Sequence, residues 1–260
     1  MITATPTTFG KLPAIALTTP GGARAIVTLY GAHLVSWTDA GGQERLFLSA
    51  KSALDGSRAI RGGVPVIFPQ FAERGSGMRH GFARVCNWRF EDGAFRLSQA
   101  DLPAALAQAW PHDFELVLRV ALEEQAMTMT LEVHNTGDSA FAFASALHSY
   151  FQVDRLAQAR VDGVQDAPLA ISDKFDQVFL RVKPILALHT GSATLAMEQT
   201  GFVDAVVWNP GAADAAAIAD MDDAEYQHFV CVEAALIDPP ALAAGASWVG
   251  TSRVTPSSIP

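Results

Sequence analysis

Apolar and polar residues alternate most regularly between positions 114 and 133. Two runs place an apolar side chain at every second position, namely Phe114, Leu116, Leu118, Val120 and Leu122, then Met127, Met129, Leu131 and Val133. Successive side chains of a β-strand point to opposite faces, so a period of two indicates a strand with one buried face. The pattern predicts an antiparallel hairpin with one polar face and a turn between the two runs.

Shorter extended runs follow one another along most of the chain, separated by turn-forming residues. They cover RAIVTLYGAHLVSW from Arg24 with a break at Gly31, ERLFLS at 44–49 after the turn DAGG at 39–42, RVCNWRFEDG, FRLSQA, VFLRV at 178–182, ATLAMEQ at 193–199, FVDAVVWNP at 202–210, HFVCVEAALI and SWVGTSRVT. Helical patterns are limited to DLPAALAQAW and AADAAAIADM, and the tail TPSSIP is expected to be loose.

Many short strands with one or two short helices predict an all-β fold, a large antiparallel β-sandwich. The pattern alone leaves a barrel open as the alternative. At 260 residues and 50% hydrophobic content, the chain is expected to form a single domain over residues 1–260.

The run FAFASALHSYFQV at 141–153 has two unlike faces. One face carries Phe141, Phe143, Leu147 and Phe151, and the other carries Ala142, Ala144, Ala146, His148 and Tyr150. We expect the aromatic face to pack in the core. Small residues beside His148 leave room for a ligand above the second face.

The chain shows no targeting signal. MITATPTTFGKL lacks the basic start and apolar run of a signal peptide, and no stretch approaches ~20 uninterrupted apolar residues. We therefore expect a cytoplasmic protein that does not contact a membrane. Cys86 and Cys231 lie in apolar runs, which favours buried free thiols over a disulfide or a metal pair, and no Cys/His spacing suggests zinc.

Charge is distributed unevenly along a chain whose formal net charge is -9. Between Lys183 and Arg253 there is no Lys or Arg, whereas nine acidic residues fall in that interval. Nucleic acids and anionic membranes need a broad basic surface, so this balance argues against both as partners. A small anion remains compatible.

The stretch at residues 58–84 is basic and so departs from this acidic balance. Its sequence is RAIRGGVPVIFPQFAERGSGMRHGFAR. The stretch holds Arg58, Arg61, Arg74, Arg79 and Arg84 against the single acid Glu73. Guanidinium groups match the oxygens of phosphate or carboxylate in pairs, and Gly62 and Gly63 would allow the backbone to approach a ligand closely. The stretch indicates a site for a small anion, with a solvated basic loop as the alternative.

The order of motifs adds a family resemblance. RGGVPVIFPQF at 61–71 followed by HGFAR at 80–84 resembles the hexose-6-phosphate mutarotases (glucose-6-phosphate 1-epimerases), a branch of the aldose 1-epimerase superfamily. WPHDFELVL at 110–118, ALHSYFQV at 146–153, WNP at 208–210 and CVE at 231–233 resemble the same family in the same order. The resemblance implies a galactose mutarotase-like supersandwich whose active site lies on the concave sheet.

The resemblance also implies which residues act. Interconverting sugar anomers requires one base and one acid but no cofactor or metal. Glu233, the only charge in FVCVEAALI, matches the family's base, and burial among apolar neighbours would raise its pKa towards neutrality. His148 matches the acid. The sequence continues as AAL where the family more often has Pro-Gly, so the backbone after Glu233 is expected to differ.

Five further residues are predicted to bind the substrate: Arg61, Gln70, His80, Arg84 and Asp176. Arg61 and Arg84 match positions that would contact a phosphate, while His80 and Asp176 match positions that bind the sugar. The partner expected is therefore a small-molecule sugar phosphate, and the resemblance favours a monomer.

Three alternatives stay open at this point. A mutarotase for free aldoses would not need the arginines, and a non-catalytic carbohydrate-binding sandwich would not need both His148 and Glu233. A glycosidase would need Glu233 and Asp176 at a defined separation across the scissile bond.

Overall fold

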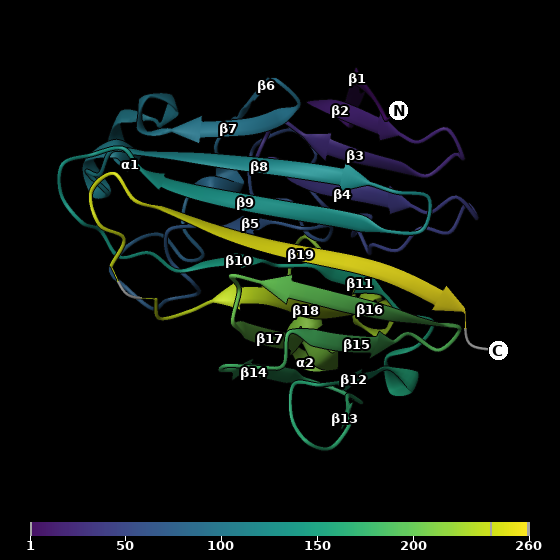
Figure 1. The fold of residues 1–260 in the computed structure, drawn as a ribbon. Coiled ribbons are helices and arrows are strands. Elements are labelled where there is room, and N and C mark those ends of the chain that lie inside the picture. Colours follow the sequence, from purple (N-terminus) through teal and green to yellow (C-terminus); the bar gives the residue numbers. More distant parts are fainter. Residues whose placement is uncertain (1, 240, 259–260) are drawn as a thin grey trace.

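A computed structural model describes residues 2–239 and 241–258, whose strands form three antiparallel sheets (Figure 1). The four-stranded sheet has the order β1 (Thr3–Phe9), β2 (Leu12–Thr18), β3 (Arg24–Thr28) and β4 (His33–Thr38). The six-stranded sheet has the order β14 (Phe175–Phe179), β17 (Asp204–Asn209), β18 (Phe229–Leu236), β10 (Ser145–Leu147) and β5 (Val66–Ile67), and β11 (Tyr150–Gln152) also pairs with β18.

The nine-stranded sheet contains the longest strands. Its order is β13 (Leu169–Ala170), β12 (Arg160–Asp162), β15 (Ile185–His189), β16 (Ala193–Thr200), β19 (Ser247–Ser258), β9 (Met127–Asn135), β8 (Phe114–Leu122), β7 (Ala94–Ser98) and β6 (Arg89–Glu91). Strands β8, β9 and β19 cross the molecule side by side (Figure 1). The β8–β9 pair is the hairpin predicted from the alternating pattern, and residues on β9 alternate between buried and half-buried throughout.

Helices are few and short among the described residues. α1 (Ala104–Ala109) falls within the first segment where a helical signal was expected, and α2 (Gly211–Ala215) overlaps the start of the second at 212–221. In the described part of the chain, no helix has the length and apolar character needed to span a membrane. The predicted all-β sandwich with one or two short helices is confirmed.

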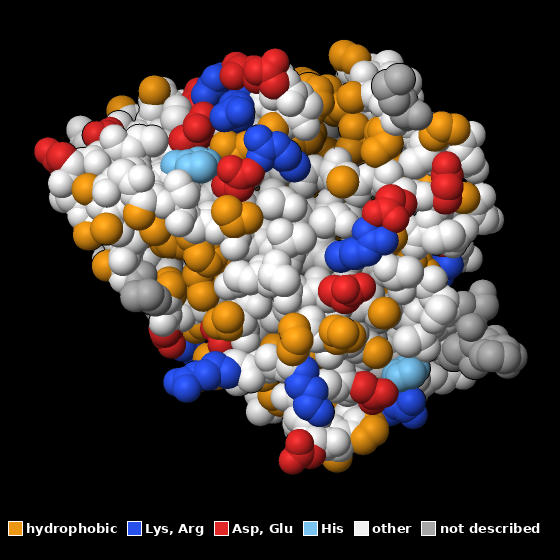
Figure 2. Space-filling view, viewed as in Figure 1, with side chains coloured by type: hydrophobic (Ala, Val, Ile, Leu, Met, Phe, Trp, Pro, Cys, Tyr) orange, Lys and Arg blue, Asp and Glu red, His pale blue; other side chains and the backbone are white. Residues whose placement is uncertain are grey.

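The largest apolar core draws on all three sheets. Trp37 comes from the four-stranded sheet, Leu147 and Val232 from the six-stranded sheet, and Phe114 and Leu131 from the nine-stranded sheet. One face of the nine-stranded sheet packs against this core, and its other face is turned to solvent. Figure 2 shows acidic and basic side chains interspersed on this side of the molecule, without a continuous basic area.

Several boundaries differ from the sequence prediction. Strands β1, β2, β5, β12, β13 and β15 were not predicted, and the strand predicted at 44–49 forms only isolated bridges. β14 spans Phe175–Phe179 rather than 178–182. The tail expected to be loose continues as β19 up to Ser258, paired with β16, and the remaining two residues lie outside the described part. Cys86 follows a short 3₁₀ turn rather than lying in a strand, although both cysteines are buried and free as predicted.

Candidate active site

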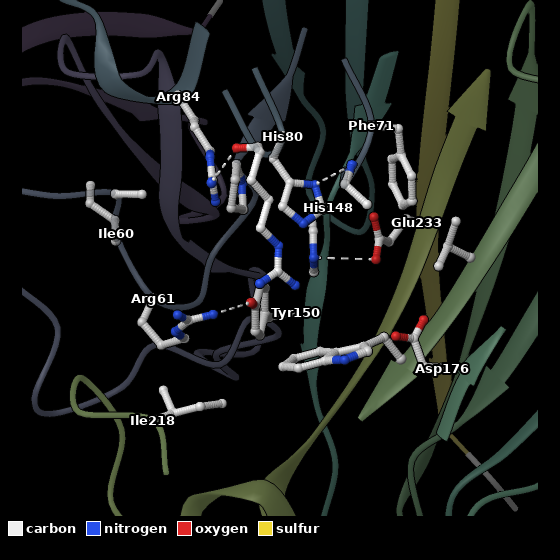
Figure 3. A pocket seen from close by; sticks show the side chains of 16 residues that line it. Ile60, Arg61, Phe71, His80, Arg84, His148, Tyr150, Asp176, Ile218 and Glu233 are labelled. Carbon is white, nitrogen blue, oxygen red and sulfur yellow. Dashed lines mark hydrogen bonds and ion pairs between the residues drawn. The ribbon is translucent and has the colours of Figure 1, made fainter. Parts of the chain in front are cut away.

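A cavity of about 230 Å³ is lined by widely separated parts of the chain (Figure 3). The six-stranded sheet contributes Asp176 from β14, Trp208 from β17 and Glu233 from β18. His148 and Tyr150 come from the β10–β11 segment, and residues of the two loops at 59–65 and 71–84, together with Ile218, complete the lining. The arginine stretch and the two residues predicted to be catalytic therefore meet in one cavity.

A break between β10 and β11 presents His148 to this cavity. Both strands pair with β18, but the continuous strand expected over 141–153 is interrupted between them. The His148 N–H donates to the Pro65 carbonyl oxygen at 3.0 Å, which continues the register of β10 with β5. Because Leu147 pairs with Ala234, His148 comes next to Glu233, the preceding residue on β18.

His148 and Glu233 form a close buried pair. His148 Nε2 lies 3.3 Å from Glu233 Oε1, and the two residues are 8% and 1% exposed (Figure 3). Within the described residues, His148 Nδ1 and Glu233 Oε2 have no hydrogen-bond partner. Buried polar atoms are nearly always paired, so two unpaired ones on side chains that line the same cavity are typical of a site completed by a ligand. Glu233 contacts the histidine rather than an arginine of the loop.

Aromatic side chains fix the orientation of the His148 ring. Tyr150 stacks on it with ring centroids 4.9 Å apart and an interplanar angle of 13°, and Trp208 meets it edge-on at 6.0 Å. The His80 ring approaches the His148 ring from the 71–84 loop, with ring centroids 5.5 Å apart and an interplanar angle of 68°. The His148 imidazole is therefore held by packing on several sides, with few rotamers available to it.

A tight loop positions His80. His80 has a positive φ of 62°, and the following Gly81 has a φ of 65° with no room for a Cβ, because the Phe68 carbonyl oxygen would lie 2.0 Å from it. The Ala72 N–H donates to His80 Nδ1 at 3.3 Å, so the imidazole is neutral and carries its proton on Nε2. Its other nitrogen is thereby available as a donor.

Three arginines line the same cavity. The guanidinium of Arg61 donates through Nε to Asp220 Oδ1 at 3.1 Å and through Nη1 to the Tyr150 hydroxyl oxygen at 3.2 Å. Arg84 Nη2 donates to the Arg79 carbonyl oxygen at 2.9 Å, while the buried Arg84 Nε has no partner among the described residues. Arg79 completes the group at the exposed rim.

The remaining sequence-predicted residues divide between the cavity and its surroundings. Asp176 lines the cavity from an exposed position on β14. Gln70 is not among the lining residues, because its side-chain amide braces the loop through the Ala72 carbonyl oxygen and through the N–H and carbonyl of Gly77. Arg58 and Arg74, two other arginines of the stretch at 58–84, also lie outside the lining, whereas Arg79 belongs to it.

Gly62 and Gly63 serve a different purpose from the one expected. A Cβ on Gly62 would lie 2.5 Å from the Phe47 carbonyl oxygen, and one on Gly63 would lie 2.3 Å from the Leu34 carbonyl oxygen. The two glycines therefore admit the protein's own backbone rather than a ligand. This close packing fixes the loop that carries Arg61.

Burial and local charge shift the pKa values of His148 and Glu233 in opposite directions, and both causes reinforce each other at each residue. Burial lowers the pKa of His148 well below its ordinary value, and His80 and Arg84 lower it further. Burial raises the pKa of Glu233 well above its ordinary value, and the nearby carboxylate of Asp176 adds to the increase. Burial, with the nearby arginines, likewise lowers the pKa of His80 to about 3. All three groups favour their uncharged forms in the unliganded protein.

Three residues of the site received no role from the sequence. Tyr150 lies two positions after His148 on the same face, so the period of two contained that signal. Trp208 belongs to the WNP motif and stands beside Tyr150 with ring centroids 5.9 Å apart. Asp220 lies 159 positions from Arg61, and no local pattern connects the two.

Comparison with known proteins establishes the family. Residues 13–174 match the sequence profile of the aldose 1-epimerase family, and the chain belongs to that family. A protein of Cenchrus ciliaris named "Putative glucose-6-phosphate 1-epimerase" is 33% identical over 275 residues, covering 91% of this chain and 82% of the relative. A protein of Salmonella typhimurium with the same name is 33% identical, covering 81% of this chain and 79% of the relative.

Solved structures show the same fold. A crystal structure titled as that of "a putative mutarotase" from Salmonella typhimurium matches with a TM-score of 0.86 and 28% identity, covering 98% of this chain and 94% of the other. A galactose mutarotase-like protein of Clostridium acetobutylicum matches with a TM-score of 0.73 at 15% identity, covering 99% of each chain, which shows the fold alone.

Proposed function

We propose that the protein interconverts the α and β anomers of hexose 6-phosphates of the glucose 6-phosphate class. The observation that carries this proposal is that a buried His148–Glu233 pair shares one cavity with Arg61, Arg79 and Arg84. A proton-transfer pair suits the anomeric centre, and a group of guanidiniums suits a phosphate. The relatives named above for glucose-6-phosphate 1-epimerase support the same substrate class.

The proposed reaction moves two protons. The Glu233 carboxylate takes the proton of the O1 hydroxyl while the His148 imidazolium gives one to the ring oxygen. The bond between C1 and the ring oxygen breaks, and the C1–O1 bond becomes a carbonyl. After rotation about the C1–C2 bond, both transfers reverse and the ring closes on the other face. Each positioned transfer typically contributes ~10²- to 10⁴-fold in rate.

The remaining cavity residues would bind and orient the sugar phosphate. Arg61 and Arg84 are assigned to the phosphate, with Arg79 at the rim as a third donor. His80 would donate from Nε2 to a sugar oxygen, and Asp176 would accept from sugar hydroxyls. Gln70 would act indirectly, because it braces the loop that carries His80.

Exchange spectroscopy by proton NMR tests substrate class and activity together. Wild type, Arg84→Ala and Arg61→Ala are compared on equilibrated glucose 6-phosphate and on glucose, with the exposed Arg58→Ala as the matched control. Removing one charge-assisted hydrogen bond to the phosphate should cost roughly 1.5–3 kcal/mol, or about ten- to a hundredfold in kcat/KM for the phosphate ester. Exchange of glucose should not fall.

Arg84→Ala is the cleaner variant of the two, because removing Arg61 also leaves the carboxylate of Asp220 without its ion-pair partner. Equal losses on both sugars, or a wild-type preference for glucose, would replace this proposal with a free-aldose mutarotase. Absence of exchange on either sugar would favour a non-catalytic carbohydrate-binding protein.

A further inference from the structure

A continuous set of contacts joins the arginines to the proton-transfer pair. Arg61 Nη1 donates to the Tyr150 hydroxyl oxygen at 3.2 Å, and the Tyr150 ring stacks on His148 with centroids 4.9 Å apart. His148 Nε2 then lies 3.3 Å from Glu233 Oε1 (Figure 3). Charge placed at the arginines therefore acts on His148 through a buried region of low polarizability, where electrostatic effects are larger than in water.

The groups around His148 are unbalanced in the unliganded protein. The charged and titratable side chains that line the cavity with it come from both loops and from the six-stranded sheet: Arg61, Arg79, His80, Arg84, Tyr150, Asp176 and Glu233. Among them, Arg61 and Arg84 oppose a proton on His148, while Asp176 opposes ionisation of Glu233. Burial favours the uncharged form of both His148 and Glu233, so the proton that the two residues can exchange rests on Glu233.

This resting arrangement is the reverse of the one that the proposed reaction needs. Ring opening requires a carboxylate at Glu233 and an imidazolium at His148. The two arrangements differ by the transfer of one proton across a 3.3 Å contact, from Glu233 Oε1 to His148 Nε2. The total charge of the pair does not change, and no proton is taken from solvent.

We propose that the phosphate of the substrate, bound at Arg61 and Arg84, moves the shared proton from Glu233 to His148 and so activates the pair. The inference rests on the proposed function. A dianion offsets the positive charge that disfavours imidazolium, whereas the two named causes that keep Glu233 protonated, burial and Asp176, do not involve the arginines. The phosphate would thus select substrates in the chemical step as well as in binding.

The expected size of the effect follows from the difference in potential between the two sites, because the pair keeps its total charge. A dianion at roughly 8 Å from His148 and about 11 Å from Glu233, with an effective dielectric constant of about 20, changes the ratio of the two proton arrangements by roughly sevenfold. Free glucose, which brings no anion, should therefore be slow in kcat and not only weak in KM.

Nitrogen NMR of labelled histidines provides a direct test. 1,5-Anhydroglucitol 6-phosphate and 1,5-anhydroglucitol both lack the O1 hydroxyl, cannot open, and differ only in the phosphate. At saturation, the phosphate ester should convert His148 to imidazolium, and carbon NMR should show Glu233 losing its carboxyl proton. The sugar without phosphate should leave both unchanged. His148→Asn identifies the resonance, and in Glu233→Gln the conversion should become dependent on pH because only solvent can supply the proton.

Kinetics provide an independent measurement on the arginines. Arg84→Gln removes a positive charge facing His148, so it should raise kcat for glucose several-fold while lowering kcat/KM for glucose 6-phosphate. Arg58→Gln, an exposed change in the same stretch outside the cavity lining, should alter neither.

The possible outcomes separate the two proposals. If glucose 6-phosphate is the preferred substrate and the phosphate analogue binds, but His148 stays neutral, the proton-transfer inference is wrong and the proposed function stands. Conversion of His148 by both analogues alike would also overturn the inference, because the sugar would then be the cause. Failure of the phosphate analogue to bind contradicts the proposed function and the inference built on it.

Discussion

Glu233 combines 1% exposure with one carboxylate oxygen, Oε2, that has no partner among the described residues. The Glu233→Gln variant keeps the shape of the side chain but cannot accept the proton of O1. We expect it to fold and bind glucose 6-phosphate, and to exchange the anomers ~10²- to 10⁴-fold more slowly than wild type. Exchange NMR measures the rate, and a titration with the unreactive phosphate analogue measures binding. A rate near that of wild type would exclude Glu233 as the base.

His148 allows a comparison among histidines of one chain. His148→Asn should lose exchange activity to a similar degree, because the amide cannot deliver a proton to the ring oxygen. His112 and His228 lie outside the cavity lining, so His112→Asn and His228→Asn should exchange at close to the wild-type rate. Equal behaviour of all three variants in the same exchange assay would remove any special role for His148.

His33 should make the folded protein sensitive to acid. It is fully buried, its Nε2 lies 2.7 Å from the Gly62 carbonyl oxygen, and burial lowers its pKa to about 4. Between that value and the ordinary 6.5 the unfolded chain binds more protons, so stability is lost as pH falls through this window. The loss should reach roughly 3 kcal/mol at pH 4.

The measurement is denaturant unfolding of wild type and His33→Gln from pH 7 to pH 4. The glutamine can still donate to Gly62 but does not titrate, so its unfolding free energy should fall less steeply over this range. Parallel curves for the two proteins would show that His33 is not the source of the acid sensitivity.

The sequence indicated which residues belong to the candidate site better than it indicated their contacts. His148 and Glu233 could be predicted because each is a polar residue in an apolar strand within a family-like motif. Gln70 was predicted to bind substrate, and the sequence did not indicate that its amide hydrogen-bonds its own loop. The Arg61–Asp220 pair joins residues 159 positions apart, and only the folded backbone brings them together.

At the scale of elements, regular alternation was the reliable signal. β8 and β9 have it and were predicted correctly, because one face packs in the core and the other meets solvent. β1 reads TATPTTF and is exposed at most positions, so it buries too little apolar surface to leave a pattern. The break at His148 was also missed, since the two faces of 141–153 keep their identity across it.

The Gly62–Gly63 turn offers an element-scale prediction. Gly63→Ala adds a Cβ that would lie 2.3 Å from the Leu34 carbonyl oxygen, at a φ of 58°. Gly42→Ala is the control, because Gly42 has a φ of 81° and open space around it. The control should cost only the left-handed penalty of about 1–2 kcal/mol, and Gly63→Ala should cost clearly more.

Denaturant unfolding measures both variants, and exchange NMR shows whether the turn also positions Arg61. We expect Gly63→Ala to lower kcat/KM for glucose 6-phosphate in the protein that remains folded, whereas Gly42→Ala should not. Equal stability of the two variants would mean that the backbone contact at Leu34 relaxes easily.

At the scale of the whole molecule, the cavity depends on topology that the sequence pattern did not contain. Most of its residues come from β14, β17, β18, the β10–β11 segment and two loops, and the order of these strands in the six-stranded sheet is not their order along the chain. Alternation can show that a strand has two faces, but it does not show which strands become neighbours. The family motifs indicated a shared site without giving its geometry.

The charge distribution of the whole molecule leads to a prediction about salt. The chain has a net charge of -9, which repels a phosphate dianion at long range, while the cavity presents Arg61, Arg79 and Arg84 at short range. Below ~0.01 M salt the screening length of about 30 Å spans the molecule, so the two effects partly offset each other. Above ~0.1 M the length is about 10 Å, and only the nearby arginines act on the phosphate.

We therefore expect KM for glucose 6-phosphate to change little at low ionic strength and to rise between ~0.1 M and ~0.5 M, as salt screens the arginines. KM for glucose should stay constant over the whole range, because a neutral sugar responds to neither charge. Arg84→Ala should flatten the rise for the phosphate ester, while Arg58→Ala should leave it unchanged. Exchange NMR at a series of salt concentrations measures all of these values. A glucose KM that rose in parallel with that of glucose 6-phosphate would show a general effect of salt on the fold, and the arginines would lose their assignment to the phosphate.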